Sequence, residues 1–129
     1  MAYRPDTSLA YGVSVIVPVH NEEDNVEEFW QRCRCALEDS DWENNFEIIF
    51  IDDRSTDSSL KILTRLSSED SQSRVLRHFE REGQSGALAT GFDNARYQFS
   101  VTIDADLQVW PEDIPQLLKE IEKYDVVNG

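Results

Sequence analysis

The chain has 129 residues, of which 40% are hydrophobic, and its 12 Lys plus Arg and 26 Asp plus Glu give a formal net charge of −14. This length suits one domain with a single core. The negative charge argues against binding of bare nucleic acid, and an anionic ligand would need a metal cation to offset it. No stretch approaches the roughly 18 consecutive apolar residues of a membrane span, so the sequence predicts a soluble globular domain.

Residues 1–12 show no strand or helix pattern and lack the apolar region of a signal peptide, so we expect a flexible N-terminal arm. From residue 13 onward, β-rich apolar runs alternate with helical patterns. This alternation predicts an α/β domain over 13–129, with a mostly parallel sheet and helices on both faces. The expected strands are "VSVIVPV" at 13–19, "FEIIFI" at 46–51, "RVLRHF" at 74–79 and "SVTI" at 100–103.

The segments after the strands repeat apolar residues with the 3.6-residue period of a helix that buries one face. Asn21 is a candidate cap of the first helix, and Thr56 or Asp57 of the second. The apolar positions are Val26, Phe29, Trp30, Cys33 and Leu37, then Leu60, Leu63 and Leu66, then Leu88, Phe92 and Ala95, and last Ile114, Leu117, Leu118 and Ile121.

The chain closes on "YDVVNG", in which Val126 and Val127 resemble part of a fifth strand. A domain rarely ends there, so we expect the 129 residues to be the N-terminal part of a longer protein. The only cysteines are Cys33 and Cys35, without a second pair that would support a zinc site. We interpret Cys33 as a core thiol in a reducing compartment such as the cytoplasm.

Polar motifs follow each expected strand: "PVHNEED", "DDRSTD", "EREGQSG" and "DADLQ". In an open parallel sheet, ligands bind beyond the carboxyl ends of the strands, so these motifs should meet at one edge. Carboxylates gathered there repel one another unless they are protonated or neutralised. The sequence therefore predicts a hard divalent cation, Mg²⁺ or Mn²⁺, at this edge.

In Asp104-Ala105-Asp106, an extended backbone would point both carboxylates to one side, and the small Ala105 would let a ligand approach. A solvated turn or a helix cap is the alternative, but the coincidence with acids at other strand ends favours a ligand site. Asp53 is not needed as a cap and is free to bind a base or a ribose hydroxyl, whereas Asp52 orients its loop. For "GQSGALATG", two interpretations stay open: a phosphate-binding loop, or glycines for tight turning and for helix–sheet packing at Gly86 and Gly91.

Together, "VSVIVPVHNEEDNV", "EIIFIDDRSTDSS", "GQSGALATGFDNA" and "TIDADLQVWPEDIPQLL" resemble the N-terminal, nucleotide-binding part of family 2 glycosyltransferases. The resemblance is closest to the polyprenyl-phosphate, or dolichol-phosphate mannose synthase-like, branch. It implies a Rossmann-like GT-A fold and transfer of a sugar from a UDP- or GDP-linked donor with a divalent metal and inversion at the anomeric carbon. It also implies a polyprenyl-phosphate acceptor and a role in cell-envelope glycans.

The resemblance assigns roles to single residues. Pro18, His20 and Glu22 would line the nucleoside pocket, and Ile51 and Asp53 would contact base and ribose. Asp104 and Ala105 would border the sugar and the diphosphate, and Asp106 and Gln108 would hold the metal. The sequence departs from the family pattern at His20, where tyrosine is more usual, and at Arg54, where glycine is common.

The family's general base lies beyond Gly129, so we expect this fragment to bind a donor without completing turnover. The implied partners are the donor and a lipid acceptor, with membrane contact only through the full-length protein at the cytoplasmic face. A sheet edge near Val126 could pair with a second copy. The alternatives are a non-catalytic nucleotide- and Mg²⁺-binding scaffold and a receiver-like signalling domain.

Overall fold

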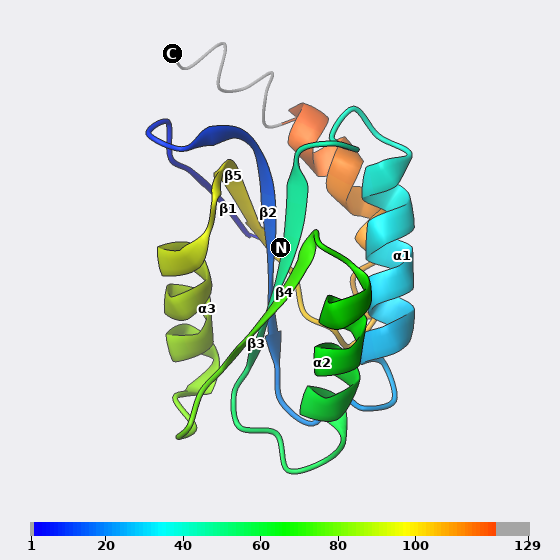
Figure 1. Ribbon diagram of the computed structural model, residues 1–129. Helices are drawn as coiled ribbons and strands as arrows, with labels where there is room; N and C mark the ends of the chain where they lie inside the picture. Colours follow the sequence, from blue (N-terminus) through cyan, green and yellow to red (C-terminus); the bar gives the residue numbers. More distant parts are fainter. Residues whose placement is uncertain (1, 121–129) are drawn as a thin grey trace.

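The computed structural model describes residues 2–120, and side chains from Pro5 onward. A five-stranded sheet with the order β1-β5-β2-β3-β4 forms the middle layer (Figure 1). Strands β2, β3, β4 and β5 run parallel, and β1 pairs antiparallel with β5. The strands span Ala2–Pro5 (β1), Ala10–Val19 (β2), Phe46–Asp52 (β3), Ser73–Arg77 (β4) and Tyr97–Thr102 (β5).

Strand β1 lies in the stretch for which we expected a flexible arm. Ala2 pairs with Thr102 and Pro5 with Phe99, so this segment extends the sheet beyond β5. Strand β2 also begins three residues earlier than the apolar run, at Ala10. Residues 2–5 form a strand because their backbone pairs with β5, which is distant in the sequence. Their own side chains show no strand pattern, so the sequence does not indicate this strand.

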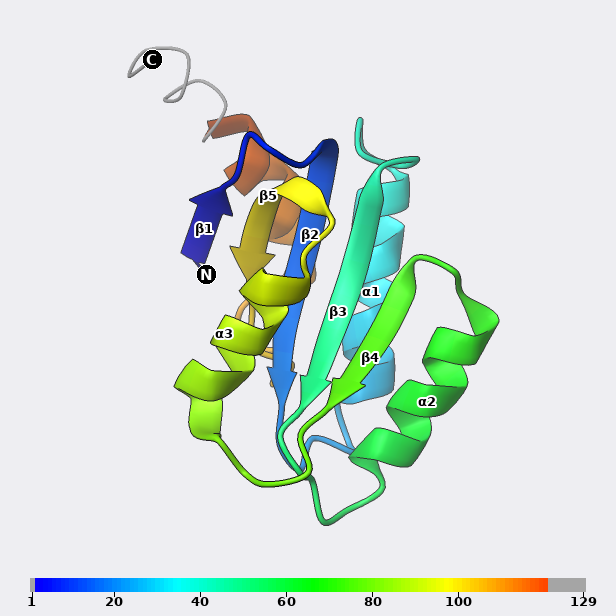
Figure 2. The same cartoon turned by 60° about the vertical axis from the view of Figure 1, so that its left-hand side comes forward.

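Helices cover both faces of the sheet, as the sequence predicts. Helices α1 (Val26–Glu38) and α2 (Ser59–Glu69) lie on one face, together with the short helix η1 (Pro111–Asp113) and the helix over 114–120. Helix α3 (Gly83–Asn94) lies on the other face (Figure 2). Within residues 2–120, no helix is long and apolar enough to cross a membrane.

Side chains alternate between the two faces along β2 and β3, because successive residues of a strand point to opposite sides. Val15 and Val17 join the larger core cluster beneath α1 and α2, whereas Ile16 joins Ile49, Ile51 and Ala87 beneath α3. The predicted helix faces are confirmed for α1, where the buried residues are Val26, Phe29, Trp30, Cys33 and Leu37.

Cys33 is fully buried, as predicted, and burial raises the pKa of its thiol far above the ordinary value. Cys35, two residues later, is exposed. The thiol of Cys33 is therefore a core group, because a thiol that stays protonated is neither a nucleophile nor a metal ligand. Ile121, Val126 and Val127, for which we expected a helical face and a fifth strand, lie outside the described residues.

The strand order places the carboxyl ends of β2 and β5 next to each other. The chain passes from β2 to β3 and β4 on one side of β2, and then returns to β5 on the other side. The crossover direction therefore reverses at β2, and in doubly wound sheets such a reversal opens a crevice at the carboxyl edge. The residues that follow β2 and β5 line this crevice.

Candidate functional site

Three of the loops at the carboxyl edge contain a residue with left-handed backbone. Asn21 after β2 has φ 55°, Arg54 after β3 has φ 55°, and Leu107 after β5 has φ 64°. Positive φ is uncommon for residues other than glycine and often marks functional loops. The positive φ at Arg54 also gives a physical reason why glycine is common at this position in the family that the sequence resembles.

Asn21 connects two of these loops, although we expected it to cap the helix that follows it. Its side-chain oxygen accepts hydrogen bonds from the backbone N–H groups of Thr56, at 2.8 Å, and Asp57, at 3.3 Å. The N-cap of α1 is Asn25, which makes no side-chain capping bond. The left-handed turn points the Asn21 amide to the neighbouring loop, so the expected cap is wrong.

The same two loops exchange further hydrogen bonds near Glu22. The N–H of Glu22 donates to Ser59 Oγ at 2.8 Å, and the N–H of Glu23 donates to Asp57 Oδ2 at 3.2 Å. In return, Glu23 Oε2 accepts from the N–H of Ser58 at 2.9 Å. These contacts join the start of α2 to the loop after β2, and they place the half-buried carboxylate of Glu22 at the crevice.

The Asp53 carboxylate is already engaged, although we expected it to be free. Its Oδ1 accepts from the N–H of Glu82 at 2.8 Å and contacts His78 Nδ1 at 2.9 Å, and its Oδ2 accepts from the N–H of Gly83 at 2.9 Å. Burial raises the pKa of this carboxyl, but the bonds from Glu82, His78 and Gly83 together outweigh it and hold the pKa below its usual range.

This arrangement decides between the two interpretations of "GQSGALATG". The Asp53 carboxylate occupies the first N–H groups of α3, where a phosphate would bind. Gly83 has φ 78° and makes the tight turn into α3, and Gly91 packs α3 against the sheet. Gly86 faces the side chain of Glu82 and not the sheet, so helix–sheet packing is confirmed at Gly91 and wrong at Gly86.

Asp52 orients its own loop, as the sequence suggested. Its side chain is almost fully buried, and its Oδ2 accepts from the N–H of Ser55 at 3.2 Å. It points away from α3, because adjacent residues of a strand face opposite sides. The neighbouring acids Asp52 and Asp53 therefore hold different loops.

Asp104, Ala105 and Asp106 lie in the loop after β5 and not on an extended strand. Strand β5 ends at Thr102, and Asp106 Oδ1 accepts from the N–H of Gln108 at 3.1 Å in a turn. Asp104 Oδ1 accepts from Gln84 Nε2 at 3.4 Å. Both carboxylates still line the crevice, with the buried Ala105 between them.

Glu112 holds the far end of this loop against α1. Its carboxylate forms a two-point ion pair with Arg32. Nε donates to Oε1 at 2.6 Å, and Nη2 donates to Oε2 at 2.9 Å. The hydrogen bond from Arg32 lowers the pKa of Glu112. The loop that carries Asp104 and Asp106 is therefore fixed by β5 at one end and by α1 at the other.

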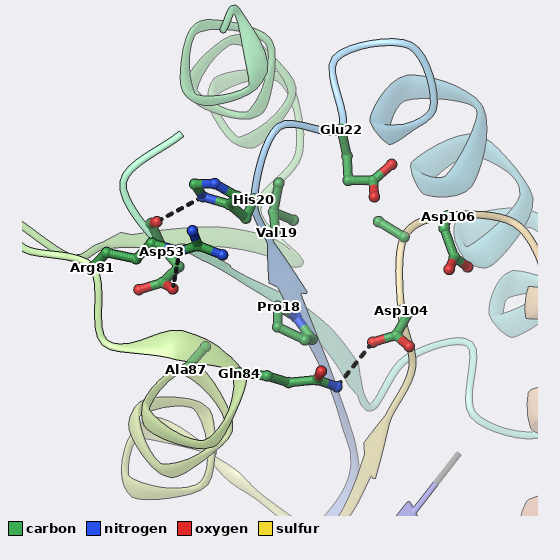
Figure 3. Close-up of a pocket in the computed structure, with 11 residues that line it drawn as sticks. Pro18, Val19, His20, Glu22, Asp53, Arg81, Gln84, Ala87, Asp104 and Asp106 are labelled. Carbon is green, nitrogen blue, oxygen red and sulfur yellow. Dashed lines mark hydrogen bonds and ion pairs between the residues drawn. The ribbon is translucent and has the colours of Figure 1, made fainter. Parts of the chain in front are cut away.

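The crevice contains a cavity of about 270 Å³ that brings most of the predicted residues together. In the view of Figure 3, His20, Asp53 and Arg81 lie at one side, and Glu22, Asp104 and Asp106 at the other. The lining residues are Pro18, Val19, His20, Glu22, Asp53, Arg81, Gln84, Ala87, Asp104, Ala105 and Asp106.

Two predicted residues do not line the cavity. Ile51 is fully buried and packs with Ile16 and Ala87 beneath it, and Gln108 is exposed. Conversely, four residues that no motif indicated line the cavity: Val19, Arg81, Gln84 and Ala87. Arg81 and Gln84 flank the start of α3, where the glycines gave the only signal, and Ala87 is one turn further along.

The lining is strongly acidic. Among the described lining residues, only Arg81 carries a permanent positive charge, and its Nε lies 3.7 Å from Asp53 Oδ2. No group of three or more His, Cys, Asp or Glu in the described part of the chain could hold a metal ion by itself. Asp104 and Asp106, which both line the cavity, are hard oxygen donors of the kind that Mg²⁺ or Mn²⁺ prefers.

A doubly wound sheet with a cavity at its carboxyl edge has the architecture of Rossmann-like domains, in which ligands bind at this crevice. Residues 14–129 match Glycosyl transferase family 2, and the chain belongs to this family. This membership sets aside the receiver-domain alternative.

The curated relatives are polyprenyl-phosphate sugar transferases, the branch that the sequence suggested. The chain is 39% identical over 117 residues to the undecaprenyl-phosphate 4-deoxy-4-formamido-L-arabinose transferase of Pseudomonas syringae pv. syringae, covering 89% of this chain and 34% of the relative. It is 38% identical over 119 residues to the Pseudomonas aeruginosa transferase of the same name, covering 91% and 34%. The chain therefore spans about a third of the length of these relatives.

Solved structures confirm the GT-A fold. S. aureus TarS, residues 1–349 in complex with UDP, has a TM-score of 0.68 at 24% identity, over 87% of this chain and 32% of that one. The mannosyltransferase PcManGT from Pyrobaculum calidifontis, in complex with GDP-Man and Mn²⁺, has a TM-score of 0.65 at 28% identity, over 85% and 32%.

Proposed function

We propose that this protein is the donor-binding part of an inverting, metal-dependent glycosyltransferase that uses a UDP- or GDP-linked sugar. The observation that carries the proposal is the convergence of the carboxyl ends of β2, β3 and β5 on one cavity, which Pro18 and His20 help to line. The nucleoside lies between His20 and Asp53, and Arg81 covers it. The diphosphate and the sugar extend toward Asp104 and Ala105.

Asp106 would hold the cation, Gln108 stays a predicted ligand beside it, and the carboxylate of Asp104 would lie near the sugar and the diphosphate. A bound cation would neutralise the charge that develops on the leaving nucleoside diphosphate. The chain's own residues bind and orient the donor. Because carboxylates surround the diphosphate position, the donor should bind weakly without a metal.

The acceptor in this proposal is a polyprenyl phosphate, because the curated relatives are named for an undecaprenyl-phosphate acceptor. One oxygen of its phosphate would form the new bond to C1 of the sugar as the bond from C1 to the nucleoside diphosphate breaks. A phosphate oxygen is already ionised at neutral pH, and residues beyond Gly129 would align it. We place the full-length protein at the cytoplasmic face of a membrane, in the synthesis of cell-envelope glycans, and a dimer is compatible with this placement.

Titration calorimetry of the 129-residue chain with UDP and GDP, with and without Mn²⁺, tests donor binding. We expect metal-dependent binding of at least one nucleotide, and Asp106→Asn should weaken it about tenfold or more, as loss of a charged metal ligand does. Asp24→Asn is the matched control, because Asp24 is an exposed acid that does not line the cavity. No metal-dependent binding to either nucleotide would refute the proposal.

Donor binding alone would also be compatible with a non-catalytic scaffold. Sugar transfer from the bound donor to a polyprenyl phosphate, assayed with the full-length protein in detergent or membranes, separates the two. Transfer that is lost in Asp106→Asn and kept in Asp24→Asn supports the enzyme. Binding without transfer in the full-length protein supports the scaffold.

A further inference from the structure

His78 lies directly behind Asp53, and nothing in the proposed function uses it. It follows the last residue of β4, and its backbone N–H donates to the carbonyl of Asp52 at 2.9 Å. Its side chain is 7% exposed and does not line the cavity. A histidine buried this far needs partners for both ring nitrogens, and it has them.

The contact between His78 Nδ1 and Asp53 Oδ1, at 2.9 Å, fixes where one ring proton lies. A carboxyl whose pKa is below its usual range is ionised at neutral pH, and an ionised carboxylate can only accept hydrogen bonds. His78 Nδ1 must therefore carry a hydrogen and donate it to Asp53.

The other ring nitrogen connects this pair to α3. His78 Nε2 lies 2.8 Å from Thr90 Oγ1 and 3.3 Å from Glu82 Oε2. The hydroxyl of Thr90 also lies 3.0 Å from the carbonyl of Gly86, so its single hydrogen can be donated either to that carbonyl or to His78 Nε2. The imidazole is therefore held at both ends, by β3 through Asp53 and by α3 through Thr90.

The donors are divided between the two oxygens of the Asp53 carboxylate. The N–H of Gly83 and the more distant Arg81 face Oδ2, whereas His78 and the N–H of Glu82 share Oδ1. Without the His78 donor, Oδ1 would depend on a single backbone N–H, that of Glu82, the exposed N-cap residue of α3. The plane of the carboxylate, and with it the lone pairs that face the cavity, would then be less well fixed.

We propose that His78 is a positioning residue for the donor nucleotide, which it serves by holding the Asp53 carboxylate through Nδ1–H in its binding orientation. This inference rests on the proposed function, in which Asp53 contacts the nucleoside. His78 itself touches no substrate, and it acts through Asp53 alone. Its role is analogous to that of an outer-shell group that orients a ligand of a metal.

Two conservative variants separate positioning from simple packing. In His78→Asn, the side-chain amide nitrogen can take the place of Nδ1 and donate to Asp53, but it cannot reach Thr90. In His78→Gln, the amide nitrogen can take the place of Nε2 and reach Thr90, but it leaves Asp53 without this donor. The probe is UDP or GDP with Mn²⁺, whichever the wild-type chain binds more tightly, and the unfolding midpoint is measured for each variant.

We expect His78→Gln to weaken nucleotide binding about tenfold, the effect of one lost charge-assisted hydrogen bond, and His78→Asn to stay within about threefold of wild type. A purely structural histidine would give equal losses in both variants or none, and either result overturns the proposal. If wild-type chain binds neither nucleotide, the proposed function and this inference fall together. Tight wild-type binding that His78→Gln leaves unchanged overturns the role of His78 alone.

A measurement on the wild-type chain keeps the inference testable if a variant fails to fold. Long-range ¹H–¹⁵N correlation spectra report which ring nitrogen of a histidine carries a proton. We expect His78 Nδ1 to carry a ring hydrogen and its ¹⁵N chemical shift to move when the nucleotide binds. An unprotonated Nδ1, or a shift that nucleotide leaves unchanged, would refute the inference.

Discussion

The backbone of Gly91 lies so close to Ile16 that a Cβ added to the glycine would fall 2.3 Å from Ile16 Cγ2. Such a Cβ would also meet Ile51 at 3.1 Å. Helix α3 thus approaches β2 and β3 more closely than any larger residue would allow, and this approach brings Gln84 and Ala87 to the cavity.

We predict that Gly91→Ala lowers the free energy of unfolding by roughly 1–2 kcal/mol. Overpacking of a core costs about 1–3 kcal/mol, and the better helix propensity of alanine offsets up to ~1 kcal/mol. Urea unfolding followed by circular dichroism measures the change. Ser85→Ala, at an exposed position of the same helix, is the control and should stay within about 0.5 kcal/mol. A Gly91→Ala variant as stable as wild type would show that α3 does not pack this closely.

Arg54 offers a test of the left-handed loops. Because its φ is 55°, Arg54→Gly removes a steric cost of roughly 1 kcal/mol, while the greater freedom of glycine in the unfolded chain offsets about 0.5–1 kcal/mol. We expect the stability to be unchanged or to rise by up to ~1 kcal/mol. Arg54→Val should lower it, because a β-branched residue tolerates positive φ poorly. The urea midpoints of both variants measure the two changes in stability. A clear loss of stability in Arg54→Gly would contradict the left-handed conformation at this position.

The connection between Asn21 and the loop after β3 can be removed without straining the backbone. Glycine accepts the φ of 55° at this position, so Asn21→Gly deletes the acceptor of the Thr56 and Asp57 N–H groups, together with the weaker contacts of the amide with the Thr56 hydroxyl and with His20 Nε2. We expect a loss of about 0.5–1 kcal/mol, since water can partly replace the amide at this exposed site. Asn21→Asp keeps an oxygen acceptor and should keep most of the stability. Equal losses in the two variants would mean that the amide oxygen is not the important atom.

The stability of the chain should fall in acid because of Asp53. Its folded-state pKa is below the ordinary value, so in the interval between the two values the unfolded chain binds more protons. The contribution of Asp53 is therefore complete above its ordinary pKa of about 3.9, and it is lost as the pH falls through the folded-state pKa.

Urea midpoints at pH 7, 5, 4 and 3 measure this dependence, and Asp53→Asn should make it shallower. Protonation also relieves the repulsion among the many carboxylates of the chain, which acts in the opposite direction. Asp24→Asn provides the matched control, because it removes one exposed charge and none of the contacts of Asp53. If both variants change the acid dependence equally, net charge and not the Asp53 cluster determines it.

Much of this site could be predicted because its carboxylates directly follow apolar strands. Asp53 and Asp104 could be placed at one edge from the alternation of strands and helices alone. The conformation of Asp104-Ala105-Asp106 could not be predicted. The turn at Leu107 depends on a left-handed backbone, and leucine is not a residue type that indicates one. The apolar run at 74–79 predicts His78 within a strand, but β4 ends at Arg77, and His78 contacts Asp53 just beyond it.

Contacts between loops were the other limit of prediction. Asn21 has the residue type of a helix cap, and it does accept backbone hydrogen bonds, but those of a loop more than 30 residues away. Arg81 and Gln84 carry no periodic signal, since their place at the cavity depends on how closely Gly91 lets α3 approach. Sequence patterns predict which face of a helix or strand is buried and where the element ends. The positions of these three side chains depend instead on how neighbouring elements pack together.

Because β1 pairs with β5, the folded sheet includes residues that lie before the region matched by the family. The family match begins at residue 14, after β1, yet residues 2–5 cover the outer edge of the strand that leads into Asp104. A chain trimmed to the family boundary would leave the β5 backbone with unpaired N–H and C=O groups, which favour association with another copy. Residues 2–5 thus protect the strand that leads into the acidic loop at Asp104. Any shortened version of the chain should therefore keep residues 2–5.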